Sequence, residues 1–178
     1  MSDLLSVVIC TYNRAESLRV AAKTVLAQAA VDGFSFELVV VDDLSTDHTR
    51  AVVEDLNAAA PHVRYASNTA TKGIAGARNS GVHAAQGNYI VFFDDDQLAD
   101  PGWLQQLHAV ATQCSARVVG GARRLDLDEK TLAGLGFVAR AIAGNDARGN
   151  AGCAGARPPS VRPPRTTSPT QVPRQRRH

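Results

Sequence analysis

Three consecutive aspartates, Asp94, Asp95 and Asp96, follow the apolar run Tyr89 to Phe93 in the stretch NYIVFFDDDQ. Two unit charges about 4 Å apart repel by roughly 4 kcal/mol at an effective dielectric constant near 20, so this cluster is costly without a positive partner. Hard divalent cations such as Mg²⁺ and Mn²⁺ bind carboxylate and phosphate oxygens together. The cluster is therefore a candidate site for a metal-bound diphosphate. A solvated turn or a helix N-cap is the alternative, because aspartate is common at both.

Polar residues also follow each of the three earlier apolar runs. TYNR follows the first run, DDLSTD follows the second and SNTATKG follows the third. Asp43 offers an acceptor for hydrogen bonds from a base or a sugar, and Tyr12 offers an aromatic face for a base. We expect Asp42 to be structural and Arg78 to meet a diphosphate or a carboxylate. Ordinary capping, packing or solvation is the alternative for these residues.

Apolar runs of strand length alternate with segments of helical periodicity. Strands are predicted at residues 4–10, 36–42, 62–67, 88–93 and 116–121. Helices are predicted at 16–30, 46–60, 73–87 and 102–114, with Ser45 or Thr46 as a cap for the second and Asp100 and Pro101 at the start of the fourth. This alternation predicts a three-layer α/β/α, Rossmann-like domain with a mainly parallel sheet. Such sheets bind ligands at the carboxyl ends of their strands.

Three common classes of α/β protein are disfavoured by the residues at these strand ends. A dinucleotide-binding dehydrogenase needs a GxGxxG turn after its first strand, whereas this chain has CTYNRAES there. A P-loop is missing, because GK[ST] occurs nowhere in the sequence. A phosphoacceptor receiver domain would carry its acidic pair after the first strand, whereas the acidic clusters here follow the second and fourth.

The composition predicts one folded domain and a tail. With 178 residues, of which 44% are hydrophobic, the chain can bury a core of ordinary size. All seventeen acidic residues lie at or before Asp146, whereas seven arginines and six of the eight prolines follow it. We expect a binding domain at residues 1–125, a partial continuation at 126–146 and a disordered Pro/Arg-rich tail at 147–178. The tail can contact anionic surfaces weakly. Because it lacks aromatic residues, a solvated segment is favoured over a nucleic-acid or lipid binder.

The N-terminal sequence MSDLLSVVIC predicts a first strand and no targeting segment. An acidic residue stands where a signal peptide has basic ones, and the apolar run is too short to span a bilayer. We therefore expect no transmembrane segment. The three cysteines show no pattern typical of a disulfide framework, which favours a reduced compartment. The expected location is the cytoplasm, or the inner face of a membrane as a peripheral protein.

Four motifs together resemble a known family. The strings SVVICTYNRAESL, ELVVVDDLSTDHT, TKGIAGARNSGVHAAQGNYIVFFDDD and ADPGWL look, in this order, like the nucleotide-sugar half of glycosyltransferase family 2. The resemblance covers roughly residues 4–121. It implies a GT-A fold, a nucleotide-diphosphate sugar donor of UDP type, a Mn²⁺ or Mg²⁺ cofactor, and transfer with inversion to an unknown glycan, lipid or protein acceptor.

The resemblance also implies roles for individual residues. The residues that the resemblance assigns to nucleotide-sugar binding are Thr11, Tyr12, Asn13, Asp43, Arg78, Asp94 and Asp95. The three aspartates match the family's DxD element, in which Asp96 ligates the metal at the diphosphate and Asp94 approaches ribose and metal. Asp43 matches the residue that binds the base of the donor. Cys10 stands where the family commonly has proline, and we expect this to change packing and not chemistry.

The catalytic residue is not identifiable from the sequence. Inverting transfer needs a base that takes the proton from the acceptor hydroxyl. The carboxylates beyond Asp100 are Asp126, Asp128, Glu129 and Asp146, and none lies in a stretch that matches the family's base. Beyond Ile142 the chain has no Leu, Ile or aromatic residue. We therefore expect either an active transferase with an unrecognised base or a catalytically incomplete, donor-binding remnant of a truncated or frame-shifted glycosyltransferase.

Overall fold

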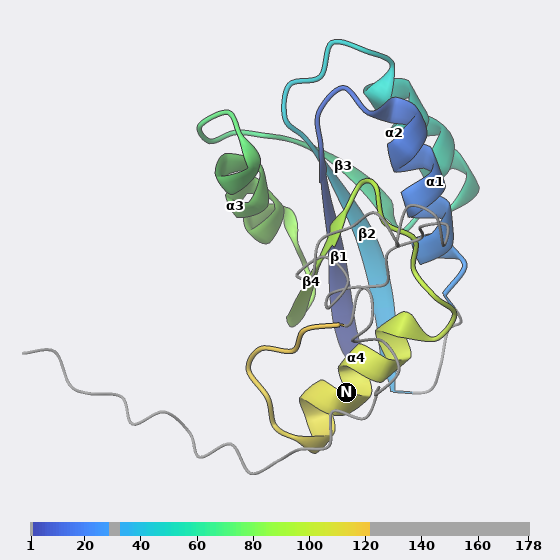
Figure 1. Ribbon diagram of the computed structural model, residues 1–178, viewed down its shortest axis with the longest axis vertical. Coiled ribbons are helices and arrows are strands. Elements are labelled where there is room, and N and C mark those ends of the chain that lie inside the picture. The colour runs from blue at the N-terminus through green and yellow to red at the C-terminus, as the bar shows by residue number, and fades with distance from the viewer. Residues whose placement is uncertain (1, 29–32, 122–178) are drawn as a thin grey trace, which may run out of the picture. The chain divides into compact units, whose positions relative to one another are not determined.

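The apolar runs of the sequence form the strands of one sheet (Figure 1). The computed structural model describes residues 2–28 and 33–121. Its strands are β1 (Asp3–Thr11), β2 (Phe34–Asp42), β3 (Val63–Ser67) and β4 (Tyr89–Asp94). Its helices are α1 (Ala15–Leu26), α2 (Thr49–Ala59), α3 (Ile74–Ala84) and α4 (Trp103–Gln113). Strands and helices alternate along the chain as the sequence predicts.

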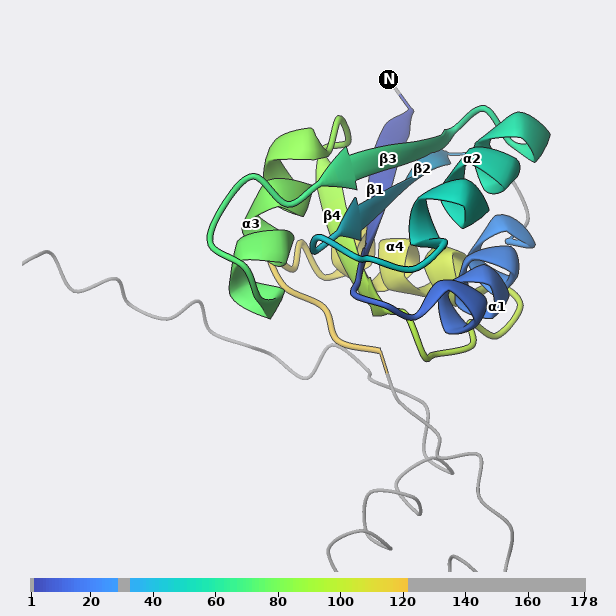
Figure 2. The same cartoon turned by 90° about the horizontal axis from the view of Figure 1, so that it is seen from above.

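The sheet has the strand order β3-β2-β1-β4, and all of the described pairings are parallel. Helix α3 covers one face, while α1, α2 and α4 lie on the other (Figures 1 and 2). This three-layer arrangement confirms the predicted fold class. In the register of the sheet, Thr11 lies opposite Asp42 and Cys10 lies opposite Asp94. The polar motifs that follow the strands therefore meet at one edge.

The inner strands β1 and β2 are apolar on both faces because helices cover both faces. On the side of α3, the buried cluster consists of Val8, Val39, Val41 and Ala77. The larger cluster on the opposite side includes Val7, Ile9, Leu18, Val25, Leu38, Val52 and Leu104. Helix α1 contributes to it through residues at helical spacing, as its sequence predicts. This core fixes the strand ends on which the polar residues stand.

Small residues let α3 approach the sheet closely. The buried residues of this helix are Gly76, Ala77, Ser80 and Gly81. A Cβ atom at Gly81 would overlap with the side chain of Val8, and one at Gly76 would overlap with the backbone carbonyl of Thr71. The glycine-rich sequence GIAGARNSG is therefore a packing requirement of this helix.

Two local predictions are wrong. The fifth strand, expected at 116–121, does not form, and Val118 within it is 90% exposed. Helix α2 begins at Thr49, and neither Ser45 nor Thr46 caps it, because both contact Asn13 instead. The N–H of Thr49 donates to Asp47 Oδ1 at 3.0 Å.

Several predictions concern residues beyond 121. The partial continuation at 126–146, the tail at 147–178 and the late carboxylates all lie outside the described residues. Within residues 2–28 and 33–121, the structure has no helix that is both long and apolar enough to cross a membrane.

Candidate functional site

Asp95 follows β4 directly and connects this strand end to the end of β1 and to the start of α1. Thr11 Oγ1 donates to Asp95 Oδ2 at 2.7 Å, and both side chains are buried. Ser17 Oγ donates to the backbone oxygen of Asp95, also at 2.7 Å. Asp95 is therefore held by the fold from two sides.

Arg14 supplies the positive partner that the acidic cluster requires. Its Nη1 atom lies 3.2 Å from Asp95 Oδ1 and 3.1 Å from Asp96 Oδ2. The negative charge of Asp95, with hydrogen bonds to both carboxylates, raises the pKa of Arg14 above its ordinary value. Sequence reasoning missed this residue. The available signal was its place in TYNR, directly after Asn13, at the same edge of the sheet.

The three aspartates differ in exposure and in partners. Their side chains are 35% exposed at Asp94, 9% at Asp95 and 59% at Asp96. Asp94 Oδ1 lies 3.6 Å from Arg78 Nη2, and Asp94 Oδ2 accepts a hydrogen bond from the Gln97 side chain at 3.0 Å. Asp96 is thus the most accessible carboxylate, while Asp95 is built into the protein.

Asp43 organises the loop between β3 and α3. Its side chain is buried, and the N–H of Gly73 lies 2.9 Å from Oδ2 and 3.2 Å from Oδ1. Asn68 Nδ2 donates to Oδ1 at 2.5 Å, and Ser80 Oγ donates to Asn68 Oδ1 at 2.9 Å. The neighbouring Asp42 accepts hydrogen bonds from the N–H of residue 45 and the Tyr65 hydroxyl. Both acids after β2 therefore hold loops in place.

Tyr12 and Asn13 extend from the end of β1. The ring of Tyr12, a residue that is 43% exposed, faces Lys72 Nζ at 4.2 Å from the ring centroid. This is a cation–π contact. The N–H of Asn13 donates to Ser45 Oγ at 2.9 Å, and Asn13 Oδ1 accepts from the N–H of Thr46 at 2.7 Å. Asn13 thus joins the loops after β1 and β2, while the Tyr12 ring lies at the surface.

Cys10 is half-buried one residue before Thr11. Burial raises the pKa of its thiol to about 11. At neutral pH the thiol is protonated, and a protonated thiol is a poor nucleophile. Cys10 packs against the small buried cluster on the side of α3. Its expected effect on packing and not on chemistry stays a prediction.

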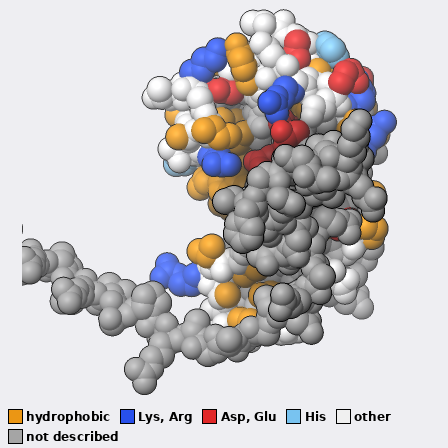
Figure 3. Space-filling model, in the orientation of Figure 1, with side chains coloured by type: hydrophobic (Ala, Val, Ile, Leu, Met, Phe, Trp, Pro, Cys, Tyr) orange, Lys and Arg blue, Asp and Glu red, His pale blue; other side chains and the backbone are white. Residues whose placement is uncertain are grey.

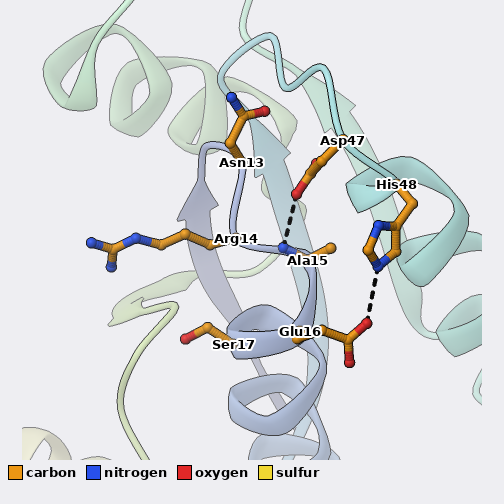
Figure 4. A pocket seen from close by; sticks show the side chains of 7 residues that line it. All are labelled: Asn13, Arg14, Ala15, Glu16, Ser17, Asp47 and His48. Atoms are coloured by element: carbon orange, nitrogen blue, oxygen red, sulfur yellow. Dashed lines mark hydrogen bonds and ion pairs between the residues drawn. The ribbon is translucent and has the colours of Figure 1, made fainter.

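A pocket of about 380 Å³ opens beside these loops, between the starts of α1 and α2 (Figure 4). It is lined by Asn13, Arg14, Ala15, Glu16, Ser17, Asp47 and His48. His48 Nε2 lies 2.9 Å from Glu16 Oε1, and Asp47 Oδ2 accepts a hydrogen bond from the N–H of Ala15 at 3.2 Å. Only Asn13 among the predicted site residues lines this pocket. Acidic and basic side chains lie next to each other across the upper surface in Figure 3.

The carboxylate oxygens that follow β4 are of the donor type that small divalent cations prefer. Within the part of the chain that the structure describes, no three Asp, Glu, His or Cys side chains are grouped to hold a metal ion by themselves. Mg²⁺ is usually held by only one or two protein carboxylates, with substrate phosphates and water as its other ligands. Oxygens from Asp95 and Asp96 already converge on a cation, the guanidinium of Arg14. Hard oxygen donors around a positive charge match this metal class.

The comparison with known families decides the assignment of the chain. The model of glycosyl transferase family 2 matches residues 6–148. The chain belongs to glycosyltransferase family 2. This confirms the resemblance that the four sequence motifs indicated.

Curated relatives and solved structures agree with this family. An uncharacterized glycosyltransferase of Nostoc sp. is 37% identical over 72% of this chain and 39% of its own length. Succinoglycan biosynthesis protein ExoO of Rhizobium meliloti is 34% identical over 70% of this chain and 35% of its own length. The chain thus spans less than two fifths of these relatives.

Among solved structures, the mannosyltransferase PcManGT of Pyrobaculum calidifontis, in complex with GDP-Man and Mn²⁺, is 25% identical with a TM-score of 0.56. That match covers 70% of this chain and 36% of PcManGT. S. aureus TarS 1-349 in complex with UDP-GlcNAc has the same TM-score at 24% identity, over 68% of this chain and 38% of TarS 1-349. The TarS likeness supports the fold.

Proposed function

We propose that the ends of β1, β2 and β4 bind a nucleotide-diphosphate sugar through a divalent metal ion, as the donor for glycosyl transfer. The observation that carries this proposal is the pair of accessible carboxylates at the end of β4, Asp94 beside Arg78 and Asp96 beside Arg14, in a chain of glycosyltransferase family 2. The solved TarS complexes contain UDP and UDP-GlcNAc, and the PcManGT complex contains GDP-Man and Mn²⁺. We favour a UDP-sugar, and GDP-mannose is the first competitor to test.

Asp96 and Asp94 would hold the Mn²⁺ or Mg²⁺ ion. Both side chains are more exposed than that of Asp95, and both follow the apolar part of β4. A bound metal at this place would neutralise the charge that develops on the departing diphosphate. Asp95 keeps the strand end in position through Thr11, and Arg78 beside Asp94 provides a guanidinium for phosphate oxygens.

The base of the donor would lie near Tyr12 and Asp43. The exposed ring of Tyr12 offers a stacking surface once Lys72 moves aside, and a base has a π-face for such a contact. Asp43 Oδ2 accepts one hydrogen bond, from Gly73, and a carboxylate oxygen can accept a second. We propose that Asp43 also keeps the loop after β3 in the shape that the base requires.

Turnover is a separate step from donor binding. Inverting transfer requires a base for the acceptor hydroxyl, and we assign none of the described residues to that role. Release of UDP from a UDP-sugar in the presence of candidate acceptors distinguishes an active transferase from a chain that binds donor without transfer.

Substitution of Asp96 tests the metal assignment. Isothermal titration of UDP-glucose, UDP-GlcNAc and GDP-mannose into the full chain with Mn²⁺ is expected to show binding of at least one of them. Asp96→Asn should weaken that binding at least about tenfold, because it removes an anionic metal ligand, and loss of residues that merely support such ligands typically costs about 10–100-fold in metal affinity. Asp55→Asn is the matched control, since Asp55 is 67% exposed and pairs with Arg19 on α1.

The two variants give opposite expectations. Asp55→Asn should bind donor like the unmodified chain, and far-UV circular dichroism should show that both variants fold. Unchanged donor binding by Asp96→Asn would contradict the assignment of Asp96 to the metal.

A further inference from the structure

One nitrogen atom of Arg14 bridges two carboxylates at the end of β4. Nη1 lies 3.2 Å from Asp95 Oδ1 and 3.1 Å from Asp96 Oδ2. The two acids differ, because the side chain of Asp95 is 9% exposed and that of Asp96 is 59% exposed. Arg14 itself is 55% exposed. The bridge therefore joins a buried carboxylate to an accessible one through a side chain that is itself more than half exposed.

We propose that Arg14 is a built-in counter-ion that competes with the divalent metal for Asp96. This inference rests on the proposed function, in which Asp96 is a metal ligand. It adds a residue that no sequence motif assigned, and it predicts how metal and nucleotide binding are coupled.

Competition follows from distance and charge. A Mg²⁺ ion that coordinates a carboxylate lies about 2.0–2.1 Å from its oxygen, so a metal on Asp96 would be close to the guanidinium that now contacts the same group. An arginine cannot relieve this repulsion by losing its proton. Thr11 holds Asp95 in place, so Asp95 stays beside Arg14 when Asp96 binds a metal. Arg14 and the metal therefore compete for the negative charge of Asp96.

The diphosphate offers the displaced guanidinium a new partner. Arginine binds phosphate oxygens through paired N–H donors, and a nucleotide diphosphate would reach the same strand end together with the metal. Metal alone has to displace Arg14 without this compensation. When UDP is present, its diphosphate compensates the displaced Arg14. Metal and UDP should therefore each strengthen the binding of the other. Arg14 thus makes the free protein a poor metal binder and the nucleotide complex a good one.

Mn²⁺ binding without nucleotide tests this proposal. The electron paramagnetic resonance signal of free Mn²⁺ reports binding to the full chain and to Arg14→Gln. We expect Arg14→Gln to bind Mn²⁺ alone about tenfold more tightly, because a unit charge has been removed from beside a partly exposed ligand. UDP should increase the Mn²⁺ affinity of this variant less than that of the unmodified chain.

Two further variants separate competition from loss of structure. Arg14→Lys keeps the charge and should retain the weak Mn²⁺ binding of the unmodified chain. Arg50→Gln removes the same charge from α2, where Arg50 is 71% exposed and pairs with Glu54, and should leave Mn²⁺ affinity unchanged. Circular dichroism on each variant shows whether it folds.

The outcomes distinguish this inference from the proposed function. If the unmodified chain binds Mn²⁺ with UDP but Arg14→Gln binds Mn²⁺ alone no more tightly, the role of Arg14 is wrong and the metal site stands. If the unmodified chain binds no Mn²⁺ even with UDP, the metal site is wrong and the inference falls with it.

Discussion

The three aspartates at the end of β4 are neighbours in sequence but have different surroundings. Asp94 lies beside Arg78 and Gln97, while Asp95 is buried against Thr11. Asp96 is exposed and contacts Arg14. Like charges are tolerated here because two arginines lie among them. Asp96 and Asp94 are also the more exposed of the three carboxylates, and we therefore propose them as the metal ligands.

Glu37 provides a test of buried charge elsewhere in the sheet. Burial alone would raise its pKa, but hydrogen bonds from Ser6 Oγ and the N–H of Gln86, with the ion pair to Arg64, lower the pKa below its ordinary value. Because the pKa is lower in the folded state, the stabilisation is present above the unfolded-state pKa. It is lost as the pH falls through the folded-state pKa. The free energy of unfolding should therefore decrease as the pH falls below about 4.5.

Glu37→Gln should lower the free energy of unfolding at pH 7 by about 1–3 kcal/mol, the usual cost of losing a hydrogen-bonded charge. It should also reduce the pH dependence below about 4.5. Urea unfolding at several pH values measures both effects. An unchanged pH dependence in the variant would show that Glu37 is not the group responsible.

The sequence predicted the acids of the site better than their partners. Runs of aspartate after apolar strands indicate where carboxylates lie, because strand ends follow from periodicity. The direction of a side chain in a loop does not follow from periodicity. Arg14 was missed for this reason, and the use of Ser45 and Thr46 to hold Asn13 was missed in the same way. None of the proposed donor contacts is tested by the structure, so all of them stay predictions, namely those of Thr11, Tyr12, Asn13, Asp43, Arg78, Asp94 and Asp95.

At the scale of elements, α3 positions the loop that Asp43 holds. This helix lies against β1 and β2 through small residues, and the N–H of Gly73 at its start contacts Asp43. Gly73 has a φ of 119°, a conformation that residues with a Cβ atom rarely adopt. The glycines of this segment therefore fix both the height of α3 above the sheet and the path of the loop.

Gly81→Ala tests this close packing. A methyl group at this position would overlap with Val8, so we expect a loss of about 1–3 kcal/mol in the free energy of unfolding, as for other overpacked cores. Val82→Ala is the control on the same helix, because Val82 is 42% exposed and should change stability by less than about 0.5 kcal/mol. Urea unfolding compares the two. Equal effects would contradict the packing argument.

Most elements before residue 114 could be predicted, and the segment after α4 could not. The inner strands and α1 show strong periodicity because each buries a continuous apolar surface. The sequence ARVVGG has the composition of a strand, yet Val118 is exposed and no partner strand lies beside it among the described residues. A strand needs a neighbour as well as suitable residues, and a short sequence does not reveal the neighbour.

At the scale of the whole molecule, the chain combines the α/β fold of its family with a C-terminal segment of different composition. The family match extends to residue 148, and the described domain ends at residue 121. The seven arginines after Asp146 lie outside the described residues, so their weak contacts with anionic surfaces stay a prediction. The chain spans 35–39% of the length of three curated relatives. The catalytic base, the acceptor and the donor sugar of the proposed transfer are therefore questions about the whole protein.

Measuring nucleotide binding with and without metal tests the proposed donor site most directly. UDP is titrated by calorimetry into the full chain, once with Mn²⁺ and once with EDTA. We expect saturable binding with Mn²⁺ and binding at least about thirtyfold weaker with EDTA, because in the proposed site the metal would join the diphosphate to Asp96. Equal affinity under the two conditions, or no binding under either, would contradict a metal-dependent donor site at the end of β4.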